Sequence, residues 1–201
     1  MQPFTTLTAV AAPLDLANVD TDKIMPARFL RKPRDPGYHL WLFHDMRLDG
    51  EGRERPEFIL NQPPYRKAQI LVAGPNFGCG SSREGAVYAL LDAGFRCVIA
   101  PSFGDIHYAN EIQNGMLPAI VSEGACAKVR EYLHQQPGAQ LTIDLAAQTI
   151  AAPDGTEYRF DIEPVNKERL LKGLDDVSLV LQHLPEIEAY EAKRKAEMPW
   201  V

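Results

Sequence analysis

The chain has 201 residues, of which 45% are hydrophobic and 24% charged. These proportions suit a soluble globular protein with one core, or one domain and a small appendage. The formal net charge of −6 argues against nucleic acid or an anionic membrane surface as the main partner, because both need clustered lysine and arginine. An anionic small molecule stays compatible, since a few well-placed arginines suffice to hold it.

The N-terminal segment and the cysteines indicate the compartment. Residues 1–20 carry no basic region ahead of their short apolar run, which argues against a signal peptide. No apolar run reaches the roughly 18 residues that a membrane span needs. Cys79, Cys97 and Cys126 form no CxxC pair. We therefore expect a cytoplasmic protein with neither a structural disulfide nor a zinc site.

The first third of the chain mixes short apolar pieces with turns. Residues 7–14 (LTAVAAPL) predict a strand, and residues 38–46 (YHLWLFHDM) predict a short helix. The polar, glycine-containing stretch at 49–56 predicts a surface loop.

A regular alternation of strand and helix patterns begins at residue 68. Apolar runs of strand length lie at 68–74, 96–103 and 116–121. Helical patterns follow them at 83–94, 104–115 and 122–138, the first two closed by Gly94 and Gly115 and the third capped by Ser122. This order predicts βαβ units with parallel strands and right-handed crossovers.

The pattern changes in the last third of the chain. Residues 139–162 alternate as short strands, and PDGT at 153–156 predicts a hairpin turn. Residues 166–174 and 176–197 are helical in pattern, the second interrupted at Pro185. Because neither repeats nor a low-complexity linker divides the chain, we expect a single α/β domain with a small β element.

The loop GPNFGCGSSREG (74–85) is the clearest candidate site. Its glycines expose backbone N–H groups, and the helix that follows adds unpaired donors and partial positive charge. The loop is therefore a ready anion site. Ser81 and Ser82 add hydroxyl groups in the predicted first turn, and Arg83 adds a planar fork for a carboxylate or phosphate. The loop also follows the carboxyl end of a parallel strand, where ligands usually bind.

The loop matches no familiar phosphate or hydrolase motif. It lacks GxxxxGK[ST], GxGxxG and GxSxG, so a carboxylate is at least as good a candidate as a phosphate. A tight turn with Ser81 as N-cap would be a purely structural alternative, although stability alone needs one cap. His107 and His134 cannot be assigned as the base of a serine hydrolase, and they are read as ordinary surface or helix-face histidines.

Residues 76–118 resemble the signature of the small-subunit family of 3-isopropylmalate dehydratase, which is similar to the swivelling domain of aconitase. Residues 10–30 and 173–194 resemble the N-terminal and C-terminal segments of the same family. The resemblance spans nearly the whole chain. It implies an α/β fold, a single β/β/α swivelling domain over residues 1–201, with a C-terminal helical segment at about 164–201.

The resemblance implies an enzyme, a hydro-lyase that isomerises 2-isopropylmalate to 3-isopropylmalate by dehydration and rehydration in leucine biosynthesis. In this family the [4Fe–4S] cluster sits on a separate large subunit. The chain is therefore expected to hold no cofactor and no metal, and to act on a small di- or tricarboxylate only with the large subunit, as a heterodimer or higher assembly. Cys79 lies in the loop, but Fe–S sites need several cysteine ligands, so an ordinary cysteine is the preferred reading.

The resemblance also implies roles for the loop residues. Ser81 takes the position of the catalytic base, while Ser82 and Arg83 take positions that hold substrate oxygens. Because a serine hydroxyl is a poor base, Ser81 would have to act as an alkoxide or nearly so, stabilised by the helix N-terminus, the loop N–H groups and Arg83. Gly78 and Gly80 would support the loop.

A second active-site region is implied in the acidic and then basic segment after the first strand. Asp20 and Asp22 would lie near the catalytic interface. Arg31 is the preferred carboxylate contact, and Phe29 and Leu30 would shape the pocket for the substrate's side chain.

Several alternatives stay open. Arg28 and Lys32 rival Arg31 as the carboxylate contact, and each can also be a solvated surface charge. The sequence departs from the family at Gly85, where members commonly carry histidine, and at residues 6–13, where many carry a His-Thr-Gly run. These departures leave room for another 2-hydroxy acid of methylmalate, dimethylmalate or homocitrate type as the substrate. A stand-alone dicarboxylate-binding module is the remaining alternative.

Overall fold

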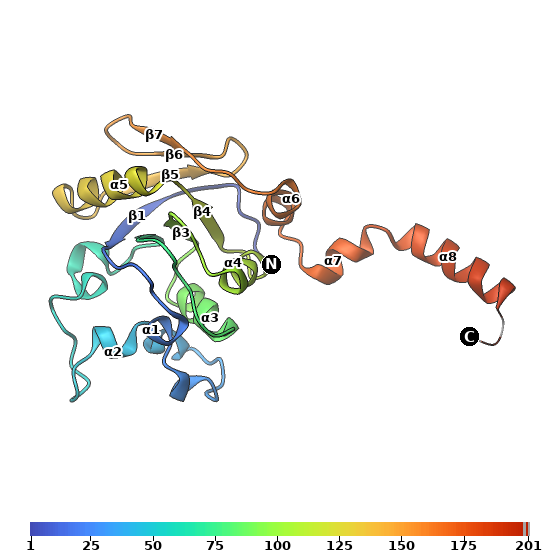
Figure 1. Cartoon of the computed structure of the whole chain (residues 1–201), viewed down its shortest axis with the longest axis horizontal. Coiled ribbons are helices and arrows are strands. Elements are labelled where there is room, and N and C mark those ends of the chain that lie inside the picture. Colours follow the sequence, from blue (N-terminus) through green and yellow to red (C-terminus); the bar gives the residue numbers. More distant parts are fainter. Residues whose placement is uncertain (199, 201) are drawn as a thin grey trace.

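A seven-stranded sheet forms the centre of the protein, seen in a computed structural model that describes residues 1–198 and residue 200 (Figure 1). The strands are β1 (Thr6–Leu14), β2 (Ile70–Ala73), β3 (Cys97–Ala100), β4 (Leu117–Ile120), β5 (Gln140–Asp144), β6 (Thr149–Ala151) and β7 (Glu157–Arg159). Their order in the sheet is β4-β3-β2-β1-β5-β6-β7. β1 to β4 pair in parallel, and β5 to β7 continue the sheet antiparallel. The predicted mixed α/β fold and its parallel strands are confirmed.

The helices are α1 (Thr21–Ile24), α2 (His44–Arg47), α3 (Glu84–Asp92), α4 (Asp105–Gln113), α5 (Glu123–Gln135), α6 (Pro164–Lys172), α7 (Asp176–Leu181) and α8 (Leu184–Glu197). Short 3-10 turns lie at Ala27–Phe29, Tyr38–Trp41, Ile59–Asn61 and Pro63–Tyr65. Ser122 caps α5 as predicted, because its side chain accepts a hydrogen bond from the N–H of Ala125. Of the helices in the described part of the chain, none is long and apolar enough to cross a membrane.

The single helix predicted for residues 38–46 is wrong. The segment forms a 3-10 turn and then α2, and Phe43 between them has a left-handed φ of 49°. The N–H of Phe43 donates to the carbonyl oxygen of Ile24 at 2.7 Å instead of joining a helix. Burial of the Phe43 ring against the sheet has overridden the local helical pattern.

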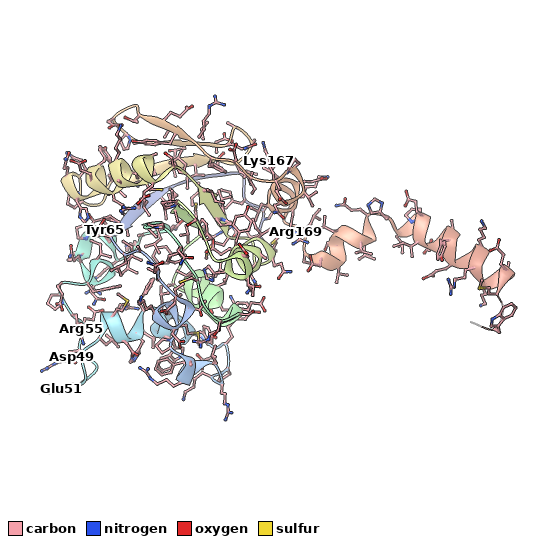
Figure 2. All side chains as sticks on the ribbon, in the orientation of Figure 1. Asp49, Glu51, Arg55, Tyr65, Lys167 and Arg169 are labelled. Atoms are coloured by element: carbon pink, nitrogen blue, oxygen red, sulfur yellow. The ribbon has the colours of Figure 1, made fainter. Side chains whose placement is uncertain are left out.

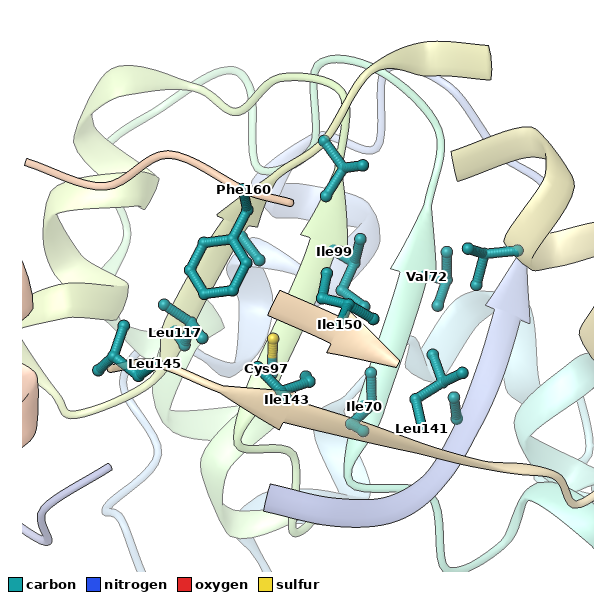
Figure 3. Close-up of a cluster of buried hydrophobic side chains, with 14 of the residues drawn as sticks. Ile70, Val72, Cys97, Ile99, Leu117, Leu141, Ile143, Leu145, Ile150 and Phe160 are labelled. Atoms are coloured by element: carbon teal, nitrogen blue, oxygen red, sulfur yellow. The ribbon is translucent and has the colours of Figure 1, made fainter. Parts of the chain in front are cut away.

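The sheet is buried on both faces, which explains why β2 and β3 read as continuous apolar runs. On one face, α5 and the curled extension β5 to β7 enclose a core in which Ile143 and Ile150 lie over Ile70 and Ile99 (Figure 3). The other face is covered by α3 and by the segment between β1 and β2. The loops at the carboxyl ends of β1, β2 and β3 are thereby held on a rigid base.

The last two helices, α7 and α8, form an arm that points away from the body (Figure 1). An ion pair joins Asp176, at the start of the arm, to Arg169 of α6. Figure 2 labels Arg169 near the point where the arm begins. Gln113 Nε2 also donates to Asp176 Oδ2 at 3.2 Å. Pro185 lies in the first turn of α8, where its missing N–H costs no helical hydrogen bond.

Candidate active site

The loop after β2 is held from both sides by backbone hydrogen bonds. On one side, the N–H of Thr21 donates to the carbonyl oxygen of Cys79 at 2.9 Å. On the other, Phe77 donates to the carbonyl oxygen of Ser102 at 3.0 Å and accepts from the N–H of Gly104 at 2.8 Å. The loop thus runs like a short central strand between the segments that follow β1 and β3.

Ser81 and Ser82 do not lie in the first turn of α3, as the sequence pattern suggested. The helix begins at Glu84, and Arg83 is its N-cap residue without a side-chain cap. A helix capped by Ser81 would need the Ser81 carbonyl oxygen for the N–H four residues later. That oxygen instead accepts a hydrogen bond from Thr21 Oγ1 at 2.9 Å. Both serines are exposed and precede the helix.

Arg83 is held in place by Asp22. The two side chains form an ion pair, and only 13% of the Arg83 side chain is exposed. The hydrogen bond from Arg83 is the main reason that the pKa of Asp22 lies below its usual value, with the N–H of Ala27 also donating to Asp22. Asp20 caps α1 by accepting from the N–H of Lys23 at 2.7 Å. The structure therefore brings both predicted carboxylates to the loop, Asp22 through Arg83 and Asp20 through the start of α1.

A cavity of about 230 Å³ lies against the loop. Its walls come from the loop, from α1 and from the N-terminal turn of α4, and they are Thr21, Gly78, Gly80, Ser81, Arg83, Gly104, Asp105, Ile106 and His107. The first N–H groups of a helix are unpaired and carry partial positive charge. The cavity therefore has two sources of positive potential, the guanidinium of Arg83 and the start of α4.

The basic residues between α1 and α2 differ in their partners. Arg28 is paired with Asp45, whose pKa it lowers to about 2. Arg31 and Lys32 are exposed, and neither forms an ion pair within residues 1–198. Arg28 is thus held by Asp45 at the surface, whereas Arg31 and Lys32 stay candidates for a carboxylate contact.

Neither Phe29 nor Leu30 lines the cavity. Phe29 stacks on Trp41 with ring centroids 4.0 Å apart. Leu30 is 42% exposed, and its Cδ2 atom lies 3.4 Å from the point that a Cβ on Gly85 would occupy. The Leu30 side chain therefore lies against the first turn of α3, whereas the Phe29 ring packs on Trp41.

Two residues at the site were missed from the sequence, Thr21 and the buried His107. His107 lies on a helix as expected, but it is 2% exposed rather than at the surface, and its Nε2 is 3.0 Å from Oε1 of the fully buried Glu111. Burial raises the pKa of Glu111, and His107 opposes that rise. The signal available in the sequence was the spacing of four residues, which puts both side chains on one face of α4. His134, in contrast, is half-exposed and pairs with Asp15.

The cysteines do not fit an iron–sulfur cluster. Cys97 and Cys126 are buried in the apolar core, and burial raises the pKa of both thiols, that of Cys126 to about 11. Cluster ligands are thiolates, which this environment disfavours. Cys79 is the remaining, partly exposed thiol. Within the described residues, His, Cys, Asp and Glu side chains form no group of three that could hold a metal ion.

The family of the chain follows from comparisons that cover its whole length. The profile described as the aconitase C-terminal domain matches residues 1–124. A second profile, described as LeuD_N, matches residues 128–164. A third, described as the C-terminal domain of the 3-isopropylmalate dehydratase small subunit, matches residues 176–201.

Similar proteins agree with these matches. A protein of Azorhizobium caulinodans named 3-isopropylmalate dehydratase small subunit is 50% identical over 201 residues, which is 100% of both chains. One of the same name from Rhodospirillum centenum is 51% identical over 100% of this chain and 98% of its own. The crystal structure of 3-isopropylmalate dehydratase (leuD) from Methanocaldococcus jannaschii is 26% identical with a TM-score of 0.64, covering 94% of this chain and 99% of that one. The chain belongs to the 3-isopropylmalate dehydratase small-subunit family, built on the fold of the aconitase C-terminal domain.

Proposed function

We propose that the chain is the small subunit of a 3-isopropylmalate dehydratase. With a large subunit that carries the [4Fe–4S] cluster, it isomerises 2-isopropylmalate to 3-isopropylmalate by dehydration and rehydration, in leucine biosynthesis. The observation that carries this proposal is the identity of about half of all residues to proteins of that name, over the full length of both chains.

Ser81 is the proposed catalytic base. In dehydration a proton leaves the carbon beside a carboxylate while the carbon–oxygen bond on the adjacent carbon breaks, and the Ser81 side chain is exposed at the cavity to receive the proton. The cluster of the large subunit would serve as the Lewis acid that accepts the departing hydroxide. A serine can do this only if its anionic form is stabilised. Arg83, the N–H groups at the start of α4 and the loop N–H groups near Gly80 are the proposed sources of that stabilisation. Gly78 supports the loop instead, because its N–H donates to the carbonyl oxygen of Val19 at 2.7 Å. Rehydration returns the proton from Ser81 to the neighbouring carbon, while hydroxide adds to the carbon that first lost the proton.

Ser82, Arg83 and Arg31 are the proposed carboxylate contacts. Asp22 contacts Nη1 of the Arg83 guanidinium, which holds the group at the cavity before a substrate carboxylate binds to it. Arg31 is exposed on the neighbouring segment and is the proposed second contact, with Lys32 as its rival. Leu30 is the proposed contact for the apolar branch of the substrate, and Phe29, stacked on Trp41, is proposed to hold the segment that carries Leu30.

The site on this chain is half of an active site. Ser81 and Ser82 are exposed, and two of the three cysteines are buried, so we expect the cluster on the large subunit. The large subunit is expected to close over this loop and bring the remaining substrate contacts. The isolated chain should therefore be inactive.

Co-expression with the cognate large subunit tests the proposal. Ser81→Ala should still form the complex and lose roughly 10²- to 10⁴-fold in kcat, the usual contribution of a positioned proton-transfer group. Ser82→Ala is the matched control, since it should chiefly raise KM. Near-normal turnover by Ser81→Ala would refute the base assignment. Tight dicarboxylate binding by the isolated chain, with no complex formed, would instead identify a stand-alone binding module, and turnover of a panel of branched malates fixes the substrate's side chain.

A further inference from the structure

Two asparagines with a left-handed backbone meet where the candidate loop begins. Asn18, with a φ of 52°, follows β1, and Asn76, with a φ of 61°, follows β2. Their side chains are joined by a hydrogen bond in which Asn76 Nδ2 donates to Asn18 Oδ1 at 2.8 Å. Of the four non-glycine residues with a positive φ among the described residues, two therefore lie in this one contact.

The contact joins three loops. The N–H of Asn76 donates to Oγ of Ser102 at 2.9 Å, and Ser102 lies in the loop after β3. The N–H of Asn18 donates to the carbonyl oxygen of Pro75 at 2.9 Å. The segments that follow β1, β2 and β3 are thus tied together at Asn76. We call Asn18, Asn76 and Ser102 the loop clasp.

The loop clasp is the first of a series of contacts that ends at Ser81. Beyond Asn76, the N–H of Gly78 donates to the carbonyl oxygen of Val19. Thr21 then donates from Oγ1 to the carbonyl oxygen of Ser81. The two segments therefore run side by side from the clasp to the proposed base. In paired extended segments, a slip of one residue turns each side chain to the opposite face. The alignment set at the clasp thus decides which way Ser81 points.

The choice of asparagine at these two positions indicates that the side chains are used. Glycine adopts a left-handed backbone more easily, because it lacks a Cβ, and Gly78 and Gly80 of the same loop do so with φ of 70° and 95°. Asparagine adopts this conformation at a cost but brings a side chain that can form hydrogen bonds. Non-glycine residues held in this region of φ cluster at functional sites.

Stability is a weak reason for the contact between the two asparagines. Asn18 is exposed and Asn76 is half-buried. A hydrogen bond between such side chains adds modestly to the free energy of unfolding, because water can take its place. The contact instead fixes the two turns against each other, and catalysis depends strongly on the placement of a reacting group.

We propose that the loop clasp is a positioning element for the reaction, which aligns the candidate loop with the segment after β1 and so places the hydroxyl of Ser81. This inference rests on the proposed function, because it takes Ser81 as the base. None of the three clasp residues lines the cavity that Ser81 lines, so they act through the loop and do not touch the substrate.

The test uses variants of the two asparagines in the complex with the large subunit. Asn76→Gly removes the donor and Asn18→Gly removes the acceptor, while glycine keeps the left-handed backbone, so the fold should persist. We expect each change to lower kcat by about tenfold, since the base is misplaced. KM should change little, and the melting temperature should stay within about 4 °C of the native value.

Two further variants show whether the shared hydrogen bond is responsible. Both single changes remove the same bond, so the double variant should lose about tenfold in kcat and not about a hundredfold. Asn18→Asp keeps an acceptor and also tolerates the left-handed backbone. It should retain most of the native kcat.

Gln148→Gly is the matched control. Gln148 has a φ of 57°, and its Nε2 donates to the carbonyl oxygen of Phe160 at 3.0 Å. It lies between β5 and β6 and does not line the cavity. This variant removes a hydrogen-bonding side chain from a left-handed position as well, but its kcat should equal that of the native protein.

The outcomes separate this inference from the proposed function. Native kcat in both asparagine-to-glycine variants, together with an inactive Ser81→Ala, would overturn the clasp and leave the base assigned. An active Ser81→Ala would overturn both. An equal loss of kcat in Gln148→Gly would show that kcat follows general stability, and losses that multiply in the double variant would show that the asparagines act separately. Either of these results would also overturn the positioning role.

Discussion

Thr21 holds Ser81 by a hydrogen bond from its Oγ1 to the Ser81 carbonyl oxygen, 2.9 Å long. The backbone N–H of Thr21 also donates to the carbonyl oxygen of Cys79 at 2.9 Å, and Thr21 is only 2% exposed. A single buried residue at the start of α1 thus fixes the loop at two points. Because Thr21 binds the carbonyl group of Ser81 and not its side chain, this contact leaves the Ser81 hydroxyl unoccupied.

Thr21→Val tests this link, because it keeps the shape of the side chain and removes the donor. We expect the free energy of unfolding to fall by about 1 kcal/mol, the usual net worth of such a hydrogen bond. In the complex, kcat should fall by about tenfold, since a loosened loop misplaces the base. Thr21→Ser is the control, because it keeps the hydroxyl donor. It should retain most of the stability and most of the kcat of the native protein. Chemical denaturation and steady-state kinetics measure the two effects, and an unchanged kcat in Thr21→Val would contradict the link.

Two features of the structure require glycine at position 78, its left-handed backbone conformation and the nearby ring of His107. Its φ is 70°, and a Cβ there would lie 2.2 Å from the His107 ring. Gly94 has a φ of 96° but nothing within 4 Å. Gly94→Ala should therefore cost only the left-handed conformation, about 1–2 kcal/mol. Gly78→Ala should cost at least about 2 kcal/mol more through overpacking. Equal melting temperatures for the two variants would show that the His107 ring can move aside without a cost in stability.

The Asp22–Arg83 pair predicts a pH effect of known sign. The pKa of Asp22 is lowered in the folded protein, first by the hydrogen bond from Arg83. Its contribution to stability is therefore full above the unfolded pKa of aspartate and is lost as pH falls through the lowered folded value. Because the Asp22 side chain is 56% exposed, the effect should stay below about 1 kcal/mol. The difference in melting temperature between the native protein and Asp22→Asn should shrink toward acid pH. A difference that grows toward acid pH would contradict the predicted loss of the Asp22 contribution.

Arg83 itself should be sensitive to a conservative change. Arg83→Lys keeps the charge but loses the planar fork that Asp22 orients and that a carboxylate would fill. We expect kcat/KM to fall by about 10²-fold, corresponding to about 2.7 kcal/mol of transition-state binding. Arg34→Lys is a matched control, since Arg34 pairs with Asp92 on α3 away from the cavity. Equal losses in the two variants would remove Arg83 from substrate binding.

The alternation from β2 to α5 could be predicted because each element carries its own local signal. Apolar runs of strand length mark β2, β3 and β4, and Ser122 marks the start of α5. The candidate loop could be found for the same reason, since its glycines, serines and Arg83 are adjacent in sequence.

The rest depended on contacts between distant segments. Thr21 and Ser81 are 60 residues apart, and the sequence around neither residue predicts the hydrogen bond between them. The break at Phe43 arises because its N–H bonds to Ile24. His107 and Glu111 had the spacing of neighbours on a helix, but their burial is set by the loop and strands that cover α4. Local pattern therefore predicts the elements, while tertiary contacts decide which polar groups meet.

Gly85 is explained by the segment that packs on it. A Cβ at this position would be 2.8 Å from the hydroxyl oxygen of Tyr38, 3.3 Å from the sulfur of Met25 and 3.4 Å from Cδ2 of Leu30. Tyr38 is 4% exposed and Met25 fully buried, so neither has open space to move into. The missing side chain lets the segment of Leu30 and Tyr38 lie directly against the first turn of α3. A larger residue here would displace the side chains proposed to shape the substrate pocket.

Gly85→Ala should consequently destabilise the protein, whereas alanine in place of an ordinary helical glycine stabilises it. At Gly124 in α5, where nothing lies within 4 Å, alanine should stabilise by up to about 1 kcal/mol. At Gly85 we expect a net loss of about 1 kcal/mol, because the clash with Tyr38 exceeds the helical gain. Adding Tyr38→Phe removes the atom that the new Cβ meets, and should recover most of the loss. In the complex, Gly85→Ala should change the ratio of kcat/KM between malates with branched and unbranched side chains, since Leu30 is displaced. Stabilisation by Gly85→Ala equal to that of Gly124→Ala, with an unchanged substrate ratio, would show that Gly85 does not set the position of this segment.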